Sequence, residues 1–259
     1  MFRGLDHIEL IVRDVEATTD FYQRLGFEFV RETDHHERSR ELRLPPPSPL
    51  VVEMHEPEME ENIGINHVAY RVSNMDAAVE ALQAAGAKLE KAPVVAKHTG
   101  RKLANFRDAE GWRLQIVMAS EEEVERNARE ATSAGPALWL DHIDMYVPDL
   151  DSSVEFYKRA GVRELRELEG GEVRAVELEL NDDPASTIEL KQVGGKHVIG
   201  INHLGFAVEN LDAAVASLRE AGYRSDYEPR VAKATQRYLC TFRDPDGWRV
   251  QLTEVEKAK

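Results

Sequence analysis

The chain repeats its own sequence, and this repeat limits the folds it can adopt more than any other feature. The stretch LDHIELIVRDVEATTDFYQRLGF, residues 5–27, returns 135 positions later as LDHIDMYVPDLDSSVEFYKRAGV. Residues 64–89 and 105–117 recur in the same way as residues 200–225 and 241–253. The 259 residues therefore form two similar halves, and the chain is long enough for two ordinary domains, each with its own core.

Each half is itself a pair of similar units, because a histidine-containing strand followed by a short helix occurs four times. In two of these helices, Asn74 and Asn210 are good N-caps, and Gly86 and Gly222 suit the position after the helix end. The rest of each unit has room for about three short strands. The predicted fold class is therefore α+β, with four β-α-β-β-β modules.

The first strand of each unit has two different faces. In residues 5–12, Ile8, Leu10 and Val12 fall on one face because strand side chains alternate. His7 falls on the other face. We expect the apolar face to pack on helices, so the histidine is expected to face the concave side of the sheet.

The join between the halves is expected where the repeat is interrupted. Residues 119–137 form a charged helical stretch that ends in a Ser-Ala-Gly-Pro break. We predict a first domain over residues 1–120, a linker over 121–136 and a second domain over 137–259.

Polar residues on later strands fall on the same face as the histidines. In the last strand of the first unit, Glu53 lies opposite Val52 and Met54, and Gln115 takes the corresponding place in the second unit. The candidate metal ligands are His7, Glu53, His67 and Gln115 in the first half, and His142, Glu189, His203 and Gln251 in the second. Two imidazoles, a carboxylate and an amide oxygen suit a divalent ion such as Zn, Ni, Co, Mn or Fe(II).

A structural role is the alternative for these histidines, because a single histidine in a strand is more often a hydrogen-bonded residue than a ligand. Four histidines at equivalent places, each matched to a later Glu or Gln, favour metal binding for at least one site. The other histidines, His55 and His197 among them, lie outside the pattern and are expected in loops or at the surface.

Composition excludes several classes of partner. A net charge of −15 argues against nucleic acid and anionic membranes, and no apolar run is long enough for a membrane span or signal peptide. One cysteine, Cys240, excludes an internal disulfide framework and fits a reducing compartment. We therefore expect a cytoplasmic protein with a small-molecule substrate. Both a monomer and a homodimer stay open.

The whole pattern resembles the vicinal oxygen chelate superfamily, which includes glyoxalase I, methylmalonyl-CoA epimerase, extradiol dioxygenases and the fosfomycin and bleomycin resistance proteins. Residues 5–27 and FRDPDGWRVQL, residues 242–252, resemble its opening and closing signatures. The resemblance implies tandem domains in which paired modules form two incompletely closed eight-stranded sheets, each around a metal cleft. It leaves open whether His7 and Glu53 share a site with the first half's ligands or with those of the second half.

The resemblance also implies a chemistry, with one departure from the family pattern. Many glyoxalases, epimerases and ring-cleaving dioxygenases carry Glu at the final-strand position, where this chain has Gln115 and Gln251. Because an amide cannot take a proton, the role of base would pass to Glu53 and Glu189. The leading hypothesis is a metal-dependent lyase or isomerase that chelates adjacent substrate oxygens and stabilises an enediolate-type intermediate. The alternatives are an Fe(II) extradiol dioxygenase and a non-catalytic binding or resistance protein.

Two arginines and two tryptophans also occupy equivalent places in the halves. The resemblance implies that Arg101 and Arg237 meet an anionic part of the substrate, and a solvated arginine at the edge of a strand is the alternative. Trp112 and Trp248 follow turns and are expected to pack rather than to stack on a ligand.

Overall fold

The computed structural model describes residues 2–33, 38–45, 50–58, 61–97, 100–118, 135–180 and 186–255. The first half contains β1 (Phe2–Ile11), α1 (Val15–Leu25), β2 (Glu28–Thr33), β3 (Ser39–Arg43), β4 (Val51–His55), β5 (Gly64–Val72), α2 (Met75–Ala85), β6 (Lys88–Val95), β7 (Lys102–Arg107) and β8 (Arg113–Met118). The second half contains β9 (Ala137–Val147), α4 (Leu150–Arg159), β10 (Arg163–Glu167), β11 (Ala175–Glu179), β12 (Thr187–Gln192), β13 (Gly200–Val208), α5 (Leu211–Glu220), β14 (Arg230–Val231), β15 (Tyr238–Arg243) and β16 (Arg249–Glu254). The predicted linker lies outside the described residues as far as residue 134.

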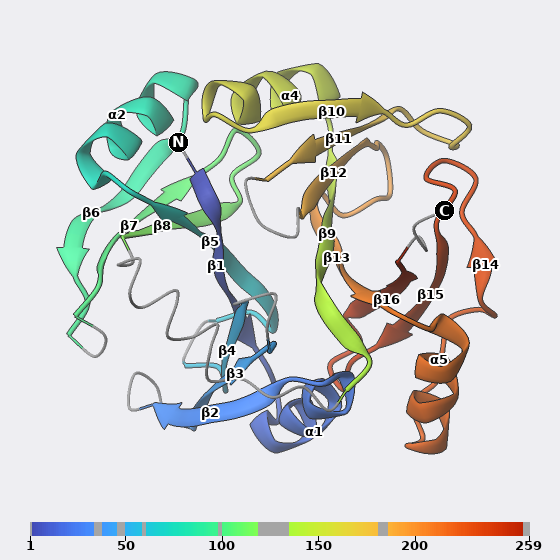
Figure 1. Cartoon of the computed structure of the whole chain (residues 1–259). Coiled ribbons are helices and arrows are strands. Elements are labelled where there is room, and N and C mark those ends of the chain that lie inside the picture. The colour runs from blue at the N-terminus through green and yellow to red at the C-terminus, as the bar shows by residue number, and fades with distance from the viewer. Residues whose placement is uncertain are drawn as a thin grey trace.

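Each half forms one mixed eight-stranded sheet. Figure 1 shows how the strands and helices of the two halves are arranged. The strand order is β2-β3-β4-β1-β5-β8-β7-β6 in the first half and β10-β11-β12-β9-β13-β16-β15-β14 in the second. The two modules of a half join through their first strands, which pair antiparallel as β1 with β5 and β9 with β13. Within the described chain the end strands of a sheet do not pair with each other, so the sheets are open. The predicted α+β fold of four β-α-β-β-β modules is confirmed.

The predicted helix ends are present. Asn74 and Asn210 each accept a backbone N–H from the third residue that follows, which satisfies one of the free donors of the first turn. Gly86 has a φ of 103° just after α2, in the left-handed region that glycine adopts at little cost. No helix within the described ranges is long and apolar enough to cross a membrane.

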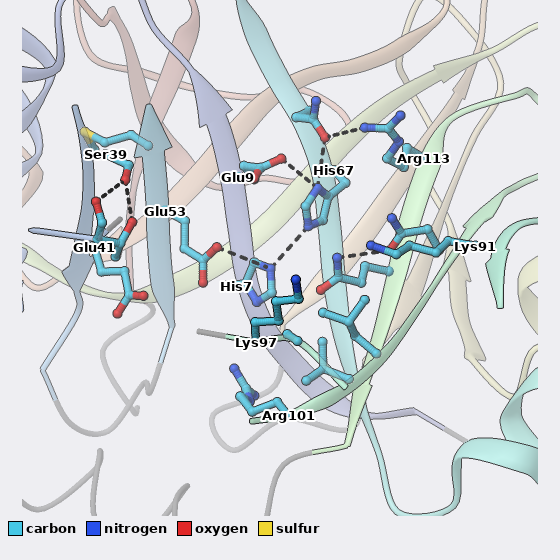
Figure 2. Close-up of a pocket in the computed structure, with 18 of the residues that line it drawn as sticks. His7, Glu9, Ser39, Glu41, Glu53, His67, Lys91, Lys97, Arg101 and Arg113 are labelled. Atoms are coloured by element: carbon cyan, nitrogen blue, oxygen red, sulfur yellow. Dashed lines mark hydrogen bonds and ion pairs between the residues drawn. The ribbon is translucent and has the colours of Figure 1, made fainter. Parts of the chain in front are cut away.

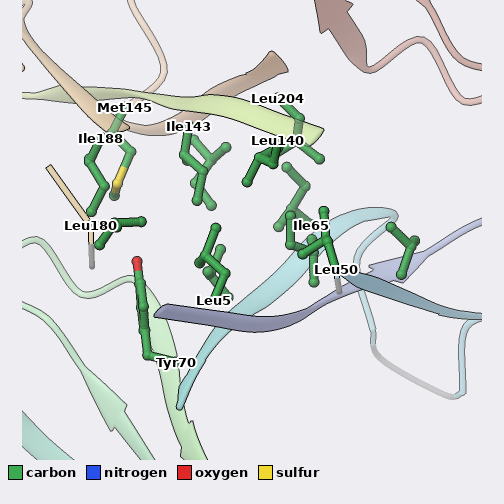
Figure 3. Packing of buried hydrophobic residues seen from close by; sticks show 14 of the residues in the cluster. Leu5, Leu50, Ile65, Tyr70, Leu140, Ile143, Met145, Leu180, Ile188 and Leu204 are labelled. Carbon is green, nitrogen blue, oxygen red and sulfur yellow. The ribbon is translucent and has the colours of Figure 1, made fainter. Parts of the chain in front are cut away.

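The apolar core is shared between the halves. The prediction gave each half a core of its own, but the buried apolar residues of both sheets belong to one continuous cluster. Leu5 and Ile65 of the first half face Leu140 and Leu204 of the second in Figure 3. The helices contact strands β2, β3, β6–β8, β10–β12, β15 and β16 of their own sheets, and α2 also contacts α4 of the other half. In the described residues, the main contacts of the helices include none of β1, β5, β9 and β13. The apolar faces of the central strands are therefore buried by the opposite sheet.

Two tryptophans pack across the contact between the halves, which confirms their expected packing role. Trp112 stands over Gly200, and Trp248 stands over Gly64. A Cβ atom on Gly200 would lie 1.8 Å from the Trp112 ring, so only glycine leaves room for this approach.

The turn before β16 holds a buried carboxylate, Asp244. Its Oδ1 accepts the backbone N–H groups of Asp246 and Trp248 at 3.0 and 2.8 Å. Burial raises the pKa of Asp244 to about 6, although the backbone donors oppose this shift. In an unfolded chain the pKa of an aspartate is about 3.9. The native state therefore keeps the proton to a higher pH, and the stability from this group is present below about pH 4 and is lost as the pH rises through about 6.

We expect Asp244→Asn to remove the loss of stability that ionisation of Asp244 causes as the pH rises. The amide oxygen can still accept the two backbone N–H groups, while the charge that burial opposes is gone. Relative to wild type, the variant should gain on the order of 2–3 kcal/mol in free energy of unfolding between about pH 4 and about pH 8. Denaturant titrations of both proteins across this range measure the gain, and a difference independent of pH would contradict the prediction.

Candidate metal centre

The four first-half candidates meet on one face of one sheet. They come from β1, β4, β5 and β8, which are neighbours in the centre of the sheet. The Nε2 atoms of His7 and His67 face each other at 3.2 Å (Figure 2). His142 and His203 form the equivalent pair at 3.0 Å in the second half. Each histidine pair therefore forms within a half, which decides between the two arrangements left open above.

Neighbouring side chains fix the orientation of the first histidine pair. His7 donates from Nδ1 to Asp6 at 2.8 Å. His67 lies with Nδ1 3.0 Å from the side-chain oxygens of both Asn66 and Glu9. The sequence prediction missed these partners, although an Asp or Asn stands immediately before the histidine in all four modules. Such outer partners set the tautomer and the ring orientation of ligand histidines.

This orientation leaves two acceptors facing each other. A neutral imidazole carries one N–H, and here Nδ1 uses it, so both Nε2 atoms present lone pairs. Two lone pairs this close need a cation between them, either a proton or a metal ion. Burial lowers the pKa of His7, but the charge of Glu53 and the contact with Asp6 outweigh it and raise the pKa to about 9.

Glu53 and Gln115 complete the candidate set. Two ligands of one ion at 2.0–2.1 Å stand about 3.0–3.4 Å apart, which is the spacing of the histidine pair. Glu53 Oε2 lies slightly farther out, at 3.9 Å from His7 Nε2. Gln115 donates its amide N–H to Asn105 at 3.1 Å, which leaves its oxygen for the site. Among the described residues, no three His, Cys, Asp or Glu side chains are already gathered as a metal centre. The donor types and the histidine spacing fit a divalent ion, and Glu53 has to approach by less than an ångström.

An open cavity of about 530 Å³ surrounds the first-half candidates. His7, Glu53, His67 and Gln115 all line it. Arg101 lines it as well, but its guanidinium is paired with Asp6.

The second half holds the same ligand types in a different electrostatic setting. Glu189 accepts from Arg237 at 2.6 Å and lies 3.0 Å from Lys191 Nζ. The side chain of Glu189 is 4% exposed, whereas that of Glu53 is 29% exposed. Burial raises the pKa of Glu189, but the charges of His142, Lys191 and Arg237 outweigh it and hold the pKa well below its usual range. Arg237, expected to meet a substrate, is paired inside the protein.

The expectation for His55 was wrong. This residue ends β4 and is buried, with Nε2 3.9 Å from Glu9 and Nδ1 donating to the carbonyl of Glu56. It pairs with Ile11 of β1 and Ser39 of β3, so its burial comes from strands distant in the sequence. His197 is exposed, as expected, and its ring contacts Tyr146. His35, His36 and His98 lie outside the described residues.

Comparison with known proteins covers both halves. Residues 4–116 and 139–252 match the family model described as Glyoxalase/Bleomycin resistance protein/Dioxygenase superfamily. The uncharacterized protein YwkD of Bacillus subtilis is 30% identical over 126 residues, which are 45% of this chain and 97% of that protein. The lactoylglutathione lyase of Haemophilus influenzae is 27% identical over 126 residues, which are 46% of this chain and 93% of that protein. Each of these relatives therefore corresponds to about half of this chain.

Solved structures match the tandem arrangement. The Mn(II)-bound glyoxalase from Novosphingobium aromaticivorans has a TM-score of 0.77 at 17% identity, covering 98% of this chain and 82% of that one. Homoprotocatechuate 2,3-dioxygenase from Arthrobacter globiformis has a TM-score of 0.72 at 18% identity, covering 99% of this chain and 80% of that one. Identities this low show a common fold.

Proposed function

The chain belongs to the Glyoxalase/Bleomycin resistance protein/Dioxygenase superfamily, and from this membership we propose that it is a divalent-metal-dependent lyase or isomerase. Its substrate is a small molecule with adjacent oxygens. The observation that carries the proposal is the histidine pair in the first half, whose facing Nε2 atoms line an open cavity together with Glu53 and Gln115. The catalytic centre is therefore assigned to the first half.

A divalent ion held by His7, His67, Glu53 and Gln115 would act as a Lewis acid that polarises a substrate oxygen. Asp6, Glu9 and Asn66 hold the two imidazoles in place for this role. The metal can be Zn, Ni, Co, Mn or Fe(II), since the nitrogen and oxygen donors suit all of them.

Glu53 is the candidate base. Its carboxylate lines the cavity, and its only ion-pair partner among the described residues is His7. A carboxylate in this position can take a proton from a carbon beside a chelating oxygen and return it to the neighbouring carbon or oxygen. Gln115 lines the same cavity but cannot accept a proton, so its role is limited to binding.

The substrate is expected to carry an anionic group beyond its chelating oxygens. Lys91, Asn105 and Gln115 form a row across β6, β7 and β8, and Lys91 lines the cavity with no ion pair in the described part of the chain. Strands lie about 4.8 Å apart, so Lys91 stands about 10 Å along the sheet from Gln115. Tyr227, the counterpart of Lys91, bonds to Thr241 at 2.7 Å instead.

We expect Lys91→Met to raise KM for an anionic substrate about tenfold, with a smaller change in kcat. A charge-assisted hydrogen bond of this kind contributes about 1.5–3 kcal/mol, and solvent access keeps the effect at the lower end. Lys88→Met is the matched control, because Lys88 lies on the same strand and does not line the cavity. If wild type, Lys91→Met and Lys88→Met had equal KM values, Lys91 would not contribute to substrate binding.

An Fe(II) ring-cleaving dioxygenase is the second candidate. His7, His67 and Glu53 have the composition of a two-histidine, one-carboxylate triad, which is the observation that favours it. Neutralising Glu53 would then cost metal binding itself, since no second carboxylate is available among the proposed ligands.

Substrate assays separate these functions. Protein loaded in turn with each candidate metal is tested for anaerobic conversion of 2-oxoaldehyde thiol adducts and acyl-CoA thioesters, and for oxygen uptake with catechols. Anaerobic conversion is the expected result. Oxygen consumption coupled to ring cleavage would replace the lyase or isomerase assignment with the second candidate. Tight binding of a compound without turnover would favour the third class, a binding or resistance protein.

A further inference from the structure

Both histidine pairs are surrounded by carboxylates at matching positions. In the first half Glu41, Glu53 and Glu9 form a row across three strands. The corresponding row in the second half is Glu177, Glu189 and Asp144. One more carboxylate precedes the first histidine of each pair, Asp6 in one half and Asp141 in the other.

The cations that neutralise these carboxylates differ between the halves. In the first half Arg31 binds Glu41 at 2.6 Å, and Arg101 binds Asp6. With both histidines neutral, as metal ligands are, the four carboxylates and the two arginines that contact them leave two negative charges in excess, which is the charge that one divalent ion balances.

The second half has the same two arginines and a lysine. Arg166 binds Glu177 at 2.5 Å, and Arg237 bridges Glu177 and Glu189 at 2.6 Å each. Lys191 binds Asp144 and lies 3.0 Å from Glu189. The third cation leaves an excess of one negative charge, less than a divalent ion carries. This third cation, Lys191, also contacts Glu189, the carboxylate that would serve as a metal ligand.

One substitution between the halves supplies the third cation. Lys191 pairs with Tyr146 across the sheet, and His55 pairs with Ile11 at the equivalent register of the first half. His55 donates to the carbonyl of Glu56, and among the described residues Glu53 forms an ion pair with His7 and with no lysine or arginine. The longer lysine reaches the buried carboxylates, because its ammonium group stands at the end of four methylene groups.

We propose that Lys191, together with Arg237, takes the place of a metal ion in the second half. The resident cations of the protein neutralise three of the four carboxylates there, and this half binds no divalent ion. The chain then binds one ion, at the first half, although it carries two complete sets of ligand types. The inference concerns the second half alone and does not depend on the reaction at the first.

Metal counting tests the proposal. Co(II) alone is the probe, and equilibrium dialysis followed by elemental analysis gives the ions bound per chain. The proteins compared are wild type, the first-half variant His7→Ala/His67→Ala, and Lys191→His, which places the first half's residue in the second half. We expect one Co(II) in wild type, none in the first-half variant, and two in Lys191→His.

Each result has a distinct meaning. One Co(II) retained in His7→Ala/His67→Ala, or two in wild type, would overturn the proposal because the second half would then hold an ion. No Co(II) in wild type would remove the first-half centre and with it the proposed function, while the inference on the second half would stand. Folded Lys191→His, checked by circular dichroism, that gains no ion would overturn the role given to Lys191.

Discussion

Glu53→Gln is expected to lower turnover by about 10²–10⁴-fold, the usual loss when a general base is removed. Most of the metal should stay bound, because the amide oxygen can still coordinate while His7, His67 and Gln115 are unchanged. The measurement is kcat at saturating metal, together with elemental analysis of the same sample. The effect on turnover should exceed the effect on metal content, since only proton transfer is lost.

The matched control for this variant is Glu189→Gln. Its carboxylate lies between Lys191 and Arg237 in the half that we propose holds no metal. The change should leave the turnover of the folded protein as it is in wild type and lower its stability instead. Full activity in metal-loaded Glu53→Gln would remove the base assignment. Parallel loss of turnover and of metal would favour the dioxygenase candidate.

Lys191→Met is expected to lower the free energy of unfolding by about 3–5 kcal/mol, the cost of leaving a buried charge without its partner. Asp144, which is fully buried, loses its only cation of fixed charge among its described partners, and Glu189 keeps Arg237 alone. Methionine has a similar length, so lost packing contributes little. Urea unfolding of the two proteins at neutral pH measures the difference.

Two further variants test whether the charge is the cause. Lys102→Met removes an exposed lysine that lies 3.4 Å from Asp76, and this change should cost less than about 1 kcal/mol. Adding Asp144→Asn to Lys191→Met should restore a large part of the lost stability, since the amide needs no counter-charge. If the double variant is as unstable as the sum of the single ones, the lysine acts through packing and not through its charge.

The fold was predictable because its signals are local. Alternation in the first strands, the asparagine N-caps and the glycines after the helices are each visible within a dozen residues, and the repeat supplied them more than once. The shared core was not predictable in this way. Alternation shows that the face with Ile8 and Leu10 is buried, but it does not tell whether a helix or a second sheet covers it.

The residue types of the candidate site could be predicted from the sequence. The pairing of its histidines and the ion pairs of its glutamates could not. Strand faces gave the histidine and glutamate positions, but the pairing of His7 with His67 depends on strand order, which arises from contacts distant in the sequence. The two glutamates looked equivalent because the ligand pattern contains no counter-ions. A signal was present all the same, since Lys191 follows Glu189 by two residues and therefore lies on the same face.

The continuous apolar layer between the sheets allows the two halves to have different roles, one in binding and one in stability. Carboxylates without enough counter-cations, such as those around Glu53, weaken a fold when no ion is bound. The layer joins this cavity to a half in which Lys191 and Arg237 of the protein itself pair with the equivalent glutamate. One copy of the duplicated unit can then serve as a rigid support, and the other can keep the unbalanced charge that binding requires. A single copy would have to meet both demands with the same residues.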